Sequence, residues 1–293
     1  MADSAPAPVD QVEFWNGAVG RTWAADYERL DRAFAPLTAA LLEAAAVQPG
    51  QQVIDVGCGA GVLSLALAPR LGRAGRILAV DISRPLLERA RARDAEAPAA
   101  DRAEIDWQEA DAGRFPFTPG AFDVLLSRFG TMFFSDPVAA FANMRRALKP
   151  SGRLVMLCWR PLEENPWITV PRAAMLQVVP PPPPVPPDAP GPFAFADAAR
   201  VGAILARAGF NDVRSTAARA VLEPYTAGPE SPLEQAVAFA TELGPPSSLL
   251  REVDEQTRRR AVDAVRYAYR ARPDAARPRL DAACWVFTAV QPG

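Results

Sequence analysis

Apolar residues follow two patterns that alternate along the chain. Short apolar runs, typical of strands buried on both faces, are separated by segments with apolar residues at three- and four-residue spacing, which is typical of helices. Strands are predicted over 53–56, 76–80, 104–108, 122–127, 153–159, 213–221 and 284–290. Helices are predicted over 14–47, 62–71, 84–95, 137–148, 161–178, 197–208 and 232–272. This alternation predicts an α/β fold in which helices cover both faces of a mostly parallel sheet.

Three segments interrupt the alternation. The first residues are rich in Pro and Ala, so we expect 1–13 to be disordered and one domain to occupy 14–293. Within it we expect a cap and linker insertion over 161–192 and a helical insertion over 228–280. The proline run 180–187 must be extended, and it is either a stiff linker or lid hinge, or a polyproline ligand for a partner.

Composition and charge exclude several classes of function. The chain has 293 residues, 49% of them apolar, and a net charge of −2, so no overall field attracts nucleic acid or an anionic membrane. It contains no histidine, which excludes Ser-His-Asp and Cys-His catalysis and histidine-ligated zinc. The three cysteines lie far apart, as expected for reduced thiols and not for a metal site. Since no secretory signal or membrane-spanning run is visible, we expect a cytoplasmic protein.

The segment from Val53 to Gly61 carries the clearest chemistry. It reads V-I-D-V-G-C-G-A-G, an apolar strand that enters three glycines at alternate positions, and a helix is predicted directly after it. Glycine lets the main chain turn sharply beside a ligand, and the free N–H groups of the helix point to the same place. A nucleotide-like ligand is therefore expected at the carboxyl end of the first strand; a glycine-rich turn without a ligand is the alternative.

The acid in this motif distinguishes among nucleotides. The pattern is D-x-G-x-G-x-G, and Val62 stands where the dinucleotide fingerprint has its third glycine. Asp55 would repel a pyrophosphate, but it suits a ligand with an ammonium group. S-adenosylmethionine (SAM) carries an ammonium and a sulfonium and has no phosphate, so we expect SAM here.

Two further acids follow predicted strands. Asp81 ends the second strand, where a carboxylate can accept both ribose hydroxyls, although it is also placed to cap the next helix. Asp111 and Ala112 follow the third strand, where an acid and a small residue can meet the adenine edge; a surface turn explains them equally well.

With these motifs the chain resembles the class I SAM-dependent methyltransferases. The resemblance is carried by 55–61, Asp81, Asp111-Ala112 and 122–155, which begins FDVLLSRFG and ends NMRRALKPSGRLV. It covers roughly residues 15–160 and is greatest with the small-molecule enzymes of ubiquinone and menaquinone biosynthesis (the UbiE type). It implies a Rossmann-like, doubly wound, seven-stranded sheet with an antiparallel last strand, SAM as cofactor, and methyl transfer to a small molecule. Ser151 replaces the family's usual glycine in a turn, where no effect on chemistry is expected.

The resemblance also implies the roles of individual residues. Asp55 and Gly57 would lie near the methionine ammonium, and Asp81 would hold the ribose. Ile82 would pack on the adenine ring, and Asp111 would accept its amino group. The implied cofactor site comprises Trp15, Trp23, Asp55, Gly57, Cys58, Gly59, Gly61, Asp81, Ile82, Asp111, Ala112, Ser127 and Arg128.

Two residues in this set would also contact the methyl acceptor, and one of two tryptophans would form a lid. Ser127 and Arg128 would line the methionine end and face the methyl acceptor, and the neighbouring Phe129 would do the same. Trp15 or Trp23 would close over the cofactor, although packing in the core explains these aromatic residues equally well.

Catalysis is expected to come mainly from positioning, because the sulfonium is already an excellent leaving group. Good alignment supplies about 7–11 kcal/mol of the barrier, so the missing histidine is tolerable. One of Glu163, Glu164 and Asn165 is predicted to contact the acceptor; a solvated loop is the alternative. A predicted cap over an apolar acceptor comprises Trp159, Pro161, Trp167, Met175 and the helices of 232–272.

Three other functions remain open at this point. A SAM-binding cyclase or decarboxylase would use the sulfonium as a charge. An NAD(P)-dependent reductase is disfavoured by Asp55 and Val62. A non-catalytic SAM-binding scaffold would dock through the proline run. The expected partner is a small-molecule acceptor, with no nucleic acid, no metal and no membrane span.

Overall fold

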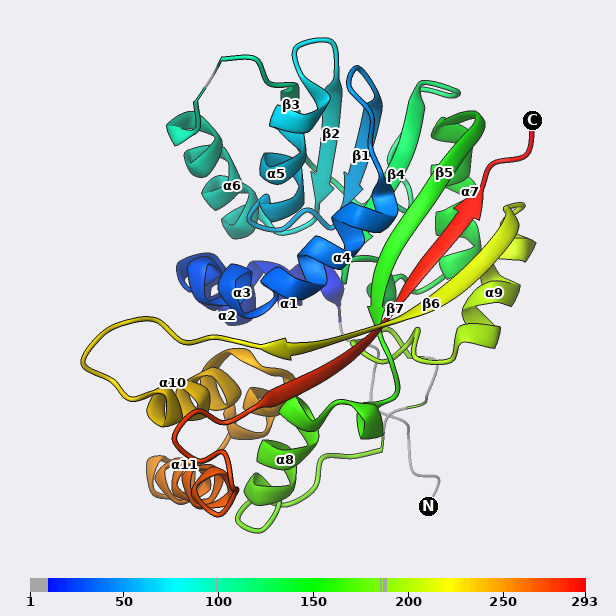
Figure 1. Cartoon of the computed structure of the whole chain (residues 1–293). Coiled ribbons are helices and arrows are strands. Elements are labelled where there is room, and N and C mark those ends of the chain that lie inside the picture. The colour runs from blue at the N-terminus through cyan, green and yellow to red at the C-terminus, as the bar shows by residue number, and fades with distance from the viewer. Residues whose placement is uncertain (1–9, 99, 185, 187–188) are drawn as a thin grey trace.

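A seven-stranded sheet runs through the molecule (Figure 1), and the computed structural model describes residues 10–98, 100–184, 186 and 189–293. Its strand order is β3-β2-β1-β4-β5-β7-β6, with β1 to β5 parallel and β7 antiparallel to both of its neighbours. The predicted Rossmann-like, doubly wound sheet is thereby confirmed. The strands are β1 (Gln52–Val56), β2 (Arg76–Asp81), β3 (Glu104–Glu109), β4 (Phe122–Arg128), β5 (Leu148–Trp159), β6 (Asn211–Leu222) and β7 (Leu280–Val290).

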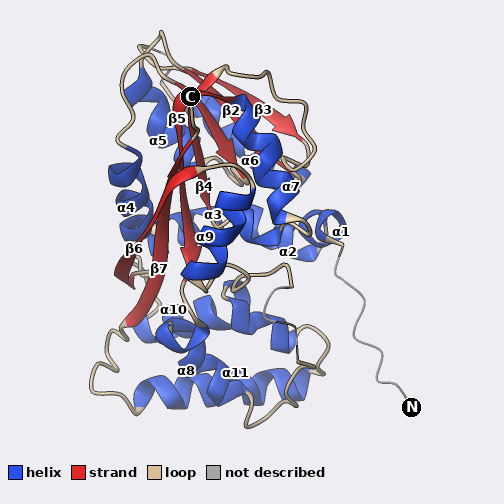
Figure 2. Ribbon diagram, turned by 90° about the vertical axis from the view of Figure 1, so that its right-hand side faces the viewer, coloured by secondary structure: helices blue, strands red, loops and turns tan. Residues whose placement is uncertain are grey.

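Helices pack on both faces of this sheet. Seen edge-on, α4 and α5 lie on one face, and α7 and α9 lie on the other (Figure 2). The α-helices of the described residues are α1 (Gln11–Asn16), α2 (Ala18–Ala25), α3 (Tyr27–Ala33), α4 (Ala35–Ala45), α5 (Val62–Leu71), α6 (Arg84–Glu96), α7 (Pro137–Ala147), α8 (Pro166–Met175), α9 (Ala198–Arg207), α10 (Pro232–Ala238) and α11 (Glu255–Arg270). No described helix is long and apolar enough to cross a membrane.

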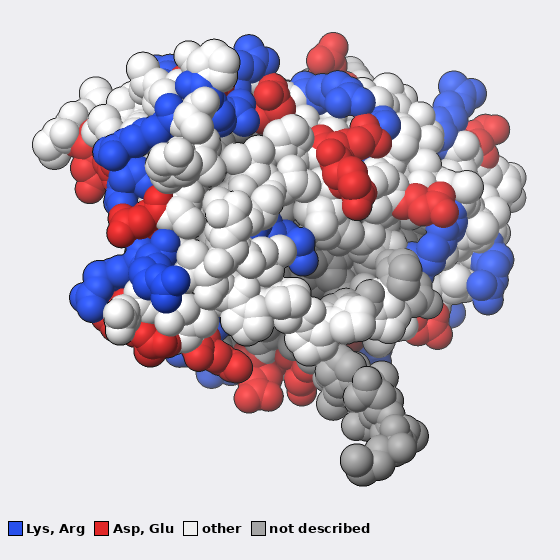
Figure 3. Space-filling model, turned by 90° about the horizontal axis from the view of Figure 1, so that it is seen from below, with Lys and Arg blue, Asp and Glu red and all other residues white. Residues whose placement is uncertain are grey.

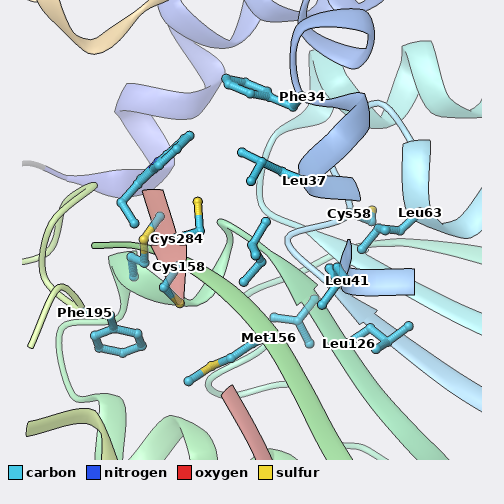
Figure 4. Packing of buried hydrophobic residues seen from close by; sticks show 14 of the residues in the cluster. Phe34, Leu37, Leu41, Cys58, Leu63, Leu126, Met156, Cys158, Phe195 and Cys284 are labelled. Atoms are coloured by element: carbon cyan, nitrogen blue, oxygen red, sulfur yellow. The ribbon is translucent and has the colours of Figure 1, made fainter. Parts of the chain in front are cut away.

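The hydrophobic core lies between the sheet and these helices. Leu37 and Leu41 of α4 point toward the strands and share the buried cluster with Leu126 of β4 (Figure 4). Burying one such side chain contributes about 1.5–3 kcal/mol. The three cysteines are buried in the same cluster and unbonded, as predicted for reduced thiols.

A further set of helices lies beyond the carboxyl ends of the parallel strands. Helices α1 to α3 lie directly below these ends, and α8, α10 and α11 form a layer beneath them (Figures 1 and 2). Helix α8 belongs to the connection from β5 to α9. Helices α10 and α11, with η3 (Phe239–Leu243) and η4 (Pro245–Leu250) between them, connect β6 to β7. Both insertions therefore reach the end of the sheet where the ligand is expected.

The N-terminal segment differs from the prediction in two ways. The long helix predicted over 14–47 is four helices, because the chain becomes extended at Gly17 and turns again at Asp26 and Phe34. Helix α1 also begins before residue 14, since the Asp10 carboxylate accepts hydrogen bonds from two N–H groups of its first turn. Disorder is therefore wrong for 11–13, whereas residues 1–9 lie outside the described residues.

Two other segments refine the prediction. Strand β5 begins at Leu148 and continues through the predicted turn, and Ser151 there has a φ of +63°, a conformation that favours glycine. This conformation explains why glycine is usual at the position. In the proline run, residues 180–184 and 186 have no regular secondary structure, while 185 and 187 lie outside the described residues.

Candidate functional site

The glycine-rich loop after β1 touches the loop after β4. Gly57 has a φ of +65°, and its N–H donates to the carbonyl of Val80 at 2.8 Å. A Cβ at Gly57 would lie 2.6 Å from the Cα of Gly130, so the two main chains approach as closely as glycine allows. This contact forms the floor of the site between the two strands.

Asp81 fixes the glycine loop to the end of β2. Its Oδ2 accepts from the N–H of Gly59 at 2.7 Å, and its Oδ1 accepts from the N–H of Ser83 at 2.8 Å. Burial raises the pKa of this carboxyl, while the two N–H groups oppose the rise. A carboxylate has about four acceptor positions, so each oxygen keeps capacity for a ligand hydroxyl.

Asp55 is a fully buried acid with one unused oxygen. Its Oδ2 accepts from the Ser64 hydroxyl at 2.7 Å, whereas Oδ1 has no hydrogen-bond partner among the described residues. Burial raises the pKa of Asp55 to about 6, and the Ser64 hydroxyl and the Arg128 guanidinium oppose this rise. A cation placed beside Oδ1 would stabilise the ionised form.

A chain of charged groups joins the N-terminal helices to this loop. The Nη1 of Arg128 donates to the Thr38 hydroxyl at 3.0 Å, and its Nη2 lies 3.8 Å from Asp31. Asp31 also accepts from the Nη2 of Arg93 at 2.8 Å, and the Nη1 of Arg93 donates to the Ala60 carbonyl at 2.5 Å. Burial raises the pKa of Asp31 and lowers that of Arg128, and the charge of each group favours the charged form of the other.

The N-terminal helices are also attached to the loop after β2. The Ser83 hydroxyl donates to the Trp15 carbonyl at 2.7 Å, and the Asn16 amide donates to the Ile82 carbonyl at 2.9 Å. The ring of Trp15 packs edge-on against the ring of Trp23, with centroids 5.4 Å apart. The two tryptophans therefore form a roof that is held to the loop beneath it.

Aromatic rings form the opposite wall. Phe129 has a φ of +66°, which is costly for a bulky residue, and its ring stacks on that of Trp159 at 4.3 Å and 7°. Trp159 in turn contacts Trp167, with centroids 5.1 Å apart, and Phe34 packs edge-on against all three rings. The unusual backbone of Phe129 thus directs its ring into a packed aromatic group.

These features surround one cavity of about 1670 Å³. It is lined by the glycine loop, the ends of β1 to β4, helices α1 to α3 and the aromatic wall. Residues of α8, η3, η4 and α11, the elements we call the cap, complete the lining. The molecule is visibly hollowed when seen from below (Figure 3). A site for a single ligand is typically about 300–1,000 Å³, so this cavity has room for two small molecules.

Comparisons with known proteins agree with this geometry. Residues 54–156 match the family model described as a methyltransferase domain. The ubiquinone/menaquinone biosynthesis C-methyltransferase UbiE of Paraburkholderia phymatum is 36% identical over 122 residues, which cover 40% of this chain and 49% of that enzyme. The chain spans about half the length of the curated relatives it matches. Residues 54–156 are therefore similar in sequence to a methyltransferase domain.

Solved methyltransferase structures share its fold. Phosphoethanolamine N-methyltransferase 2 of Haemonchus contortus, solved with SAM, superposes with a TM-score of 0.59 at 17% identity, over 99% of this chain and 62% of that one. The cyclase SpnF superposes with a TM-score of 0.54 at 17% identity, over 98% and 99% of the two chains. At this identity the likeness shows the fold alone.

The similarity to methyltransferases indicates SAM as the cofactor, and the residues present fit it. Asp55 offers its buried Oδ1 for the ammonium, and Asp81 offers free acceptor positions for the ribose hydroxyls. A Cβ added at Gly59 would meet no atom of the described residues within 4 Å, so the main chain there faces open space that a ligand can enter. Acids at the ends of neighbouring strands suit a cationic cofactor.

Most of the predicted cofactor residues line the cavity, and two do not. Gly61 packs away from it, because a Cβ there would lie 2.6 Å from the Trp107 ring. Ser127 is fully buried and accepts from the N–H of Gly130 at 3.2 Å, so it supports the loop from behind. The predicted residues on the cavity are Trp15, Trp23, Asp55, Gly57, Cys58, Gly59, Asp81, Ile82, Asp111, Ala112 and Arg128.

Of the residues predicted to contact or cover the acceptor, some line the cavity and others do not. Glu163 lines the cavity, but Glu164 forms ion pairs with two arginines, and Asn165 is buried with its Oδ1 accepting from the N–H of Ala283 at 2.9 Å. Trp159, Pro161 and Trp167 line the cavity as predicted, whereas Met175 is buried behind it. Asp31, Phe34 and Phe129 line it as well; only Phe129 had a signal in the sequence, through its place beside Arg128.

Proposed function

We propose that the chain transfers the methyl group of SAM to a small, largely apolar organic acceptor. One observation carries this proposal: a single cavity joins the glycine loop and Asp81 at one end to a wall of Phe34, Phe129 and Trp159 at the other. The similarity to a C-methyltransferase supports methyl transfer, and the aromatic wall supports an acceptor with an apolar surface.

The cofactor supplies an activated methyl group, which the acceptor's electron pair receives while the bond to sulfur breaks. The residues of the chain position the cofactor and the acceptor and exclude water from them. Asp55 would hold the methionine ammonium of the cofactor and Asp81 its ribose, and the stacked ring of Phe129 limits where an acceptor can lie. The Trp15 and Trp23 roof excludes water, and alignment of this kind is worth about 7–11 kcal/mol. No histidine is present, so an acceptor that is already nucleophilic fits this site best.

A labelling experiment tests the proposal. The purified protein is incubated with methyl-labelled SAM and a small-molecule extract, and both products are followed by mass spectrometry. Methyl transfer predicts one labelled small molecule and an equal amount of S-adenosylhomocysteine (SAH). Tight SAH binding with no labelled product from any extract, but with a new unlabelled isomer, would instead indicate a cyclase. Absence of SAH binding would refute the assignment of the site.

A further inference from the structure

Charge is distributed unevenly along the cavity. At the cofactor end, acids stand at the carboxyl ends of three neighbouring strands: Asp55 is the last but one residue of β1, Asp81 is the last residue of β2, and Asp111 follows β3. At the cap end, three arginines from separate elements line the same cavity: Arg172 of α8, Arg251 after η4 and Arg258 of α11. In the view from below, a basic side chain lies beside the hollow (Figure 3).

The arginines of the cap lack acidic partners of the usual kind. The side chain of Arg172 has no hydrogen bond, ion pair or ring contact among the described residues, although the residue is only partly exposed. The Arg251 guanidinium lies 5.0 Å above the ring of Phe14, and burial lowers its pKa. Arg258 donates to the Leu250 carbonyl, and its one ion pair among the described residues is a long, partly exposed one with Glu255 at 4.0 Å. Several N–H donors of this group are therefore free to bind an anion.

The acids that line the cap end of the cavity are either engaged with other groups or exposed. Glu242 is paired with Arg29 at 3.0 Å, and Asp10 accepts from the first N–H groups of α1. Glu163 lines the cavity but is exposed, and it forms no ion pair within the described residues. Glu252 favours the charged form of Arg251 but does not line the cavity, so the lining of its cap end has more arginines than unpaired acids.

Helix α8 sets the distance between the apolar part of the cavity and the arginines of the cap. Trp167 and Ile168 of α8 line the apolar part of the cavity, and Arg172 lies four residues after Ile168 on the same helix face. Four residues correspond to about 6 Å along a helix. A molecule with an apolar body against the aromatic wall would therefore place a group about one helical turn away beside Arg172.

We propose that the methyl acceptor carries an anionic group, a carboxylate or a phosphate, which Arg172 binds with the help of Arg258 and Arg251. This inference rests on the proposed function and specifies its acceptor. The planar guanidinium of arginine matches either anion through two parallel hydrogen bonds, and an otherwise apolar site gives these bonds their strength. The acids at the far end repel such a group, so the acceptor can enter in one orientation only.

Matched probes test the proposal without knowledge of the acceptor. With SAH present, binding of 1-naphthoate, 1-naphthyl phosphate and the neutral 1-naphthamide is measured by quenching of the cavity tryptophans Trp159 and Trp167. At least one anion should bind about tenfold more tightly than the amide, and the stronger one identifies the anionic group. R172M should remove this preference while leaving amide binding within about twofold, and R172K should retain part of it.

Controls separate this inference from the proposed function. R260M removes an exposed arginine of α11 that does not line the cavity, and it should leave all three affinities unchanged. SAH affinity, measured by calorimetry on every variant, reports a folded cofactor site. Equal binding of anions and amide by protein that binds SAH, or an unchanged preference in both R172M and R258M, would overturn the proposal. Loss of SAH binding in the unmodified chain would overturn the proposed function instead.

Discussion

The contact between Gly57 and Gly130 predicts three distinct stability changes when each of three glycines becomes alanine. Gly120→Ala places a side chain at a φ of +62° in open space, so it isolates backbone strain. Gly130→Ala has an ordinary φ of −83°, but its Cβ would lie 2.7 Å from the Cα of Gly57, so it isolates the steric clash. Gly57→Ala combines a φ of +65° with the same clash at 2.6 Å.

The magnitudes follow from these geometries. Left-handed backbone costs a non-glycine residue about 1–2 kcal/mol, and the stiffer unfolded chain returns about 0.4–1 kcal/mol, so Gly120→Ala should lower the free energy of unfolding by about 1 kcal/mol. Overpacking costs about 1–3 kcal/mol, which is the loss expected for Gly130→Ala. Gly57→Ala should lose about 2–4 kcal/mol, since it combines the two effects.

Urea unfolding followed by tryptophan fluorescence measures all three variants against the unmodified chain. The double variant Gly57→Ala/Gly130→Ala should lose less than the sum of its single changes, because both side chains force the same two loops apart. If Gly57→Ala lost no more stability than Gly120→Ala, or if Gly130→Ala were neutral, the close approach of the two loops would be refuted.

Four further predictions concern the charged groups of the site. In the proposed site the ammonium of bound SAH would lie by Asp55, whose pKa is about 6, so SAH affinity should rise about tenfold from pH 5 to pH 7 with proton release, and Asp55→Asn should flatten this profile in calorimetry. The same raised pKa means that the free energy of unfolding should fall as pH rises from about 4 to 6. Asp81→Asn should weaken SAH binding about 10- to 100-fold, since charged acceptors of hydrogen bonds contribute about 1.5–3 kcal/mol. Asp31→Asn and Arg93→Met should each weaken SAH binding about tenfold, and the double variant should be no worse than either, because both break one link between the roof and the glycine loop.

Each of these predictions has its own contrary outcome. A pH profile that persists in Asp55→Asn would place the titrating group elsewhere. Full SAH affinity in Asp81→Asn, with an unchanged melting temperature, would remove that carboxylate from the ribose site. Additive losses in the Asp31 and Arg93 pair would show independent roles. The exposed pair Arg73 and Asp101 provides the matched control, and its removal should leave SAH affinity unaltered.

The sheet and the cofactor end of the site could be predicted because their signals are local. Asp55 and Asp81 each close an apolar strand, and parallel strands bring their carboxyl ends to one edge. Ser127 differs from its neighbour Arg128 in a way that its sequence position does not reveal. It is fully buried and accepts from the N–H of Gly130, a contact that depends on how the loop after β4 turns back.

The acceptor end could be predicted only in outline, because long-range packing forms it. Asp31 and Arg93 are 62 positions apart in the chain, and nothing in either neighbourhood indicates that they meet. Arg172 looks like any surface arginine until α8 is folded against the cavity. The break of the N-terminal helix at Gly17 escaped prediction because the apolar spacing continues through it.

The attachment of the helical cap has a consequence for how this architecture diversifies. The chain leaves the sheet at Leu222 and returns at Leu280, and these two residues are direct partners in the antiparallel pairing of β6 and β7. Everything between them is in effect the loop of a hairpin, whose ends stay adjacent whatever its length. Such a module can be exchanged for another by recombination without altering the strands that carry Asp55 and Asp81. Chemistry and acceptor choice can therefore evolve at separate rates within one polypeptide.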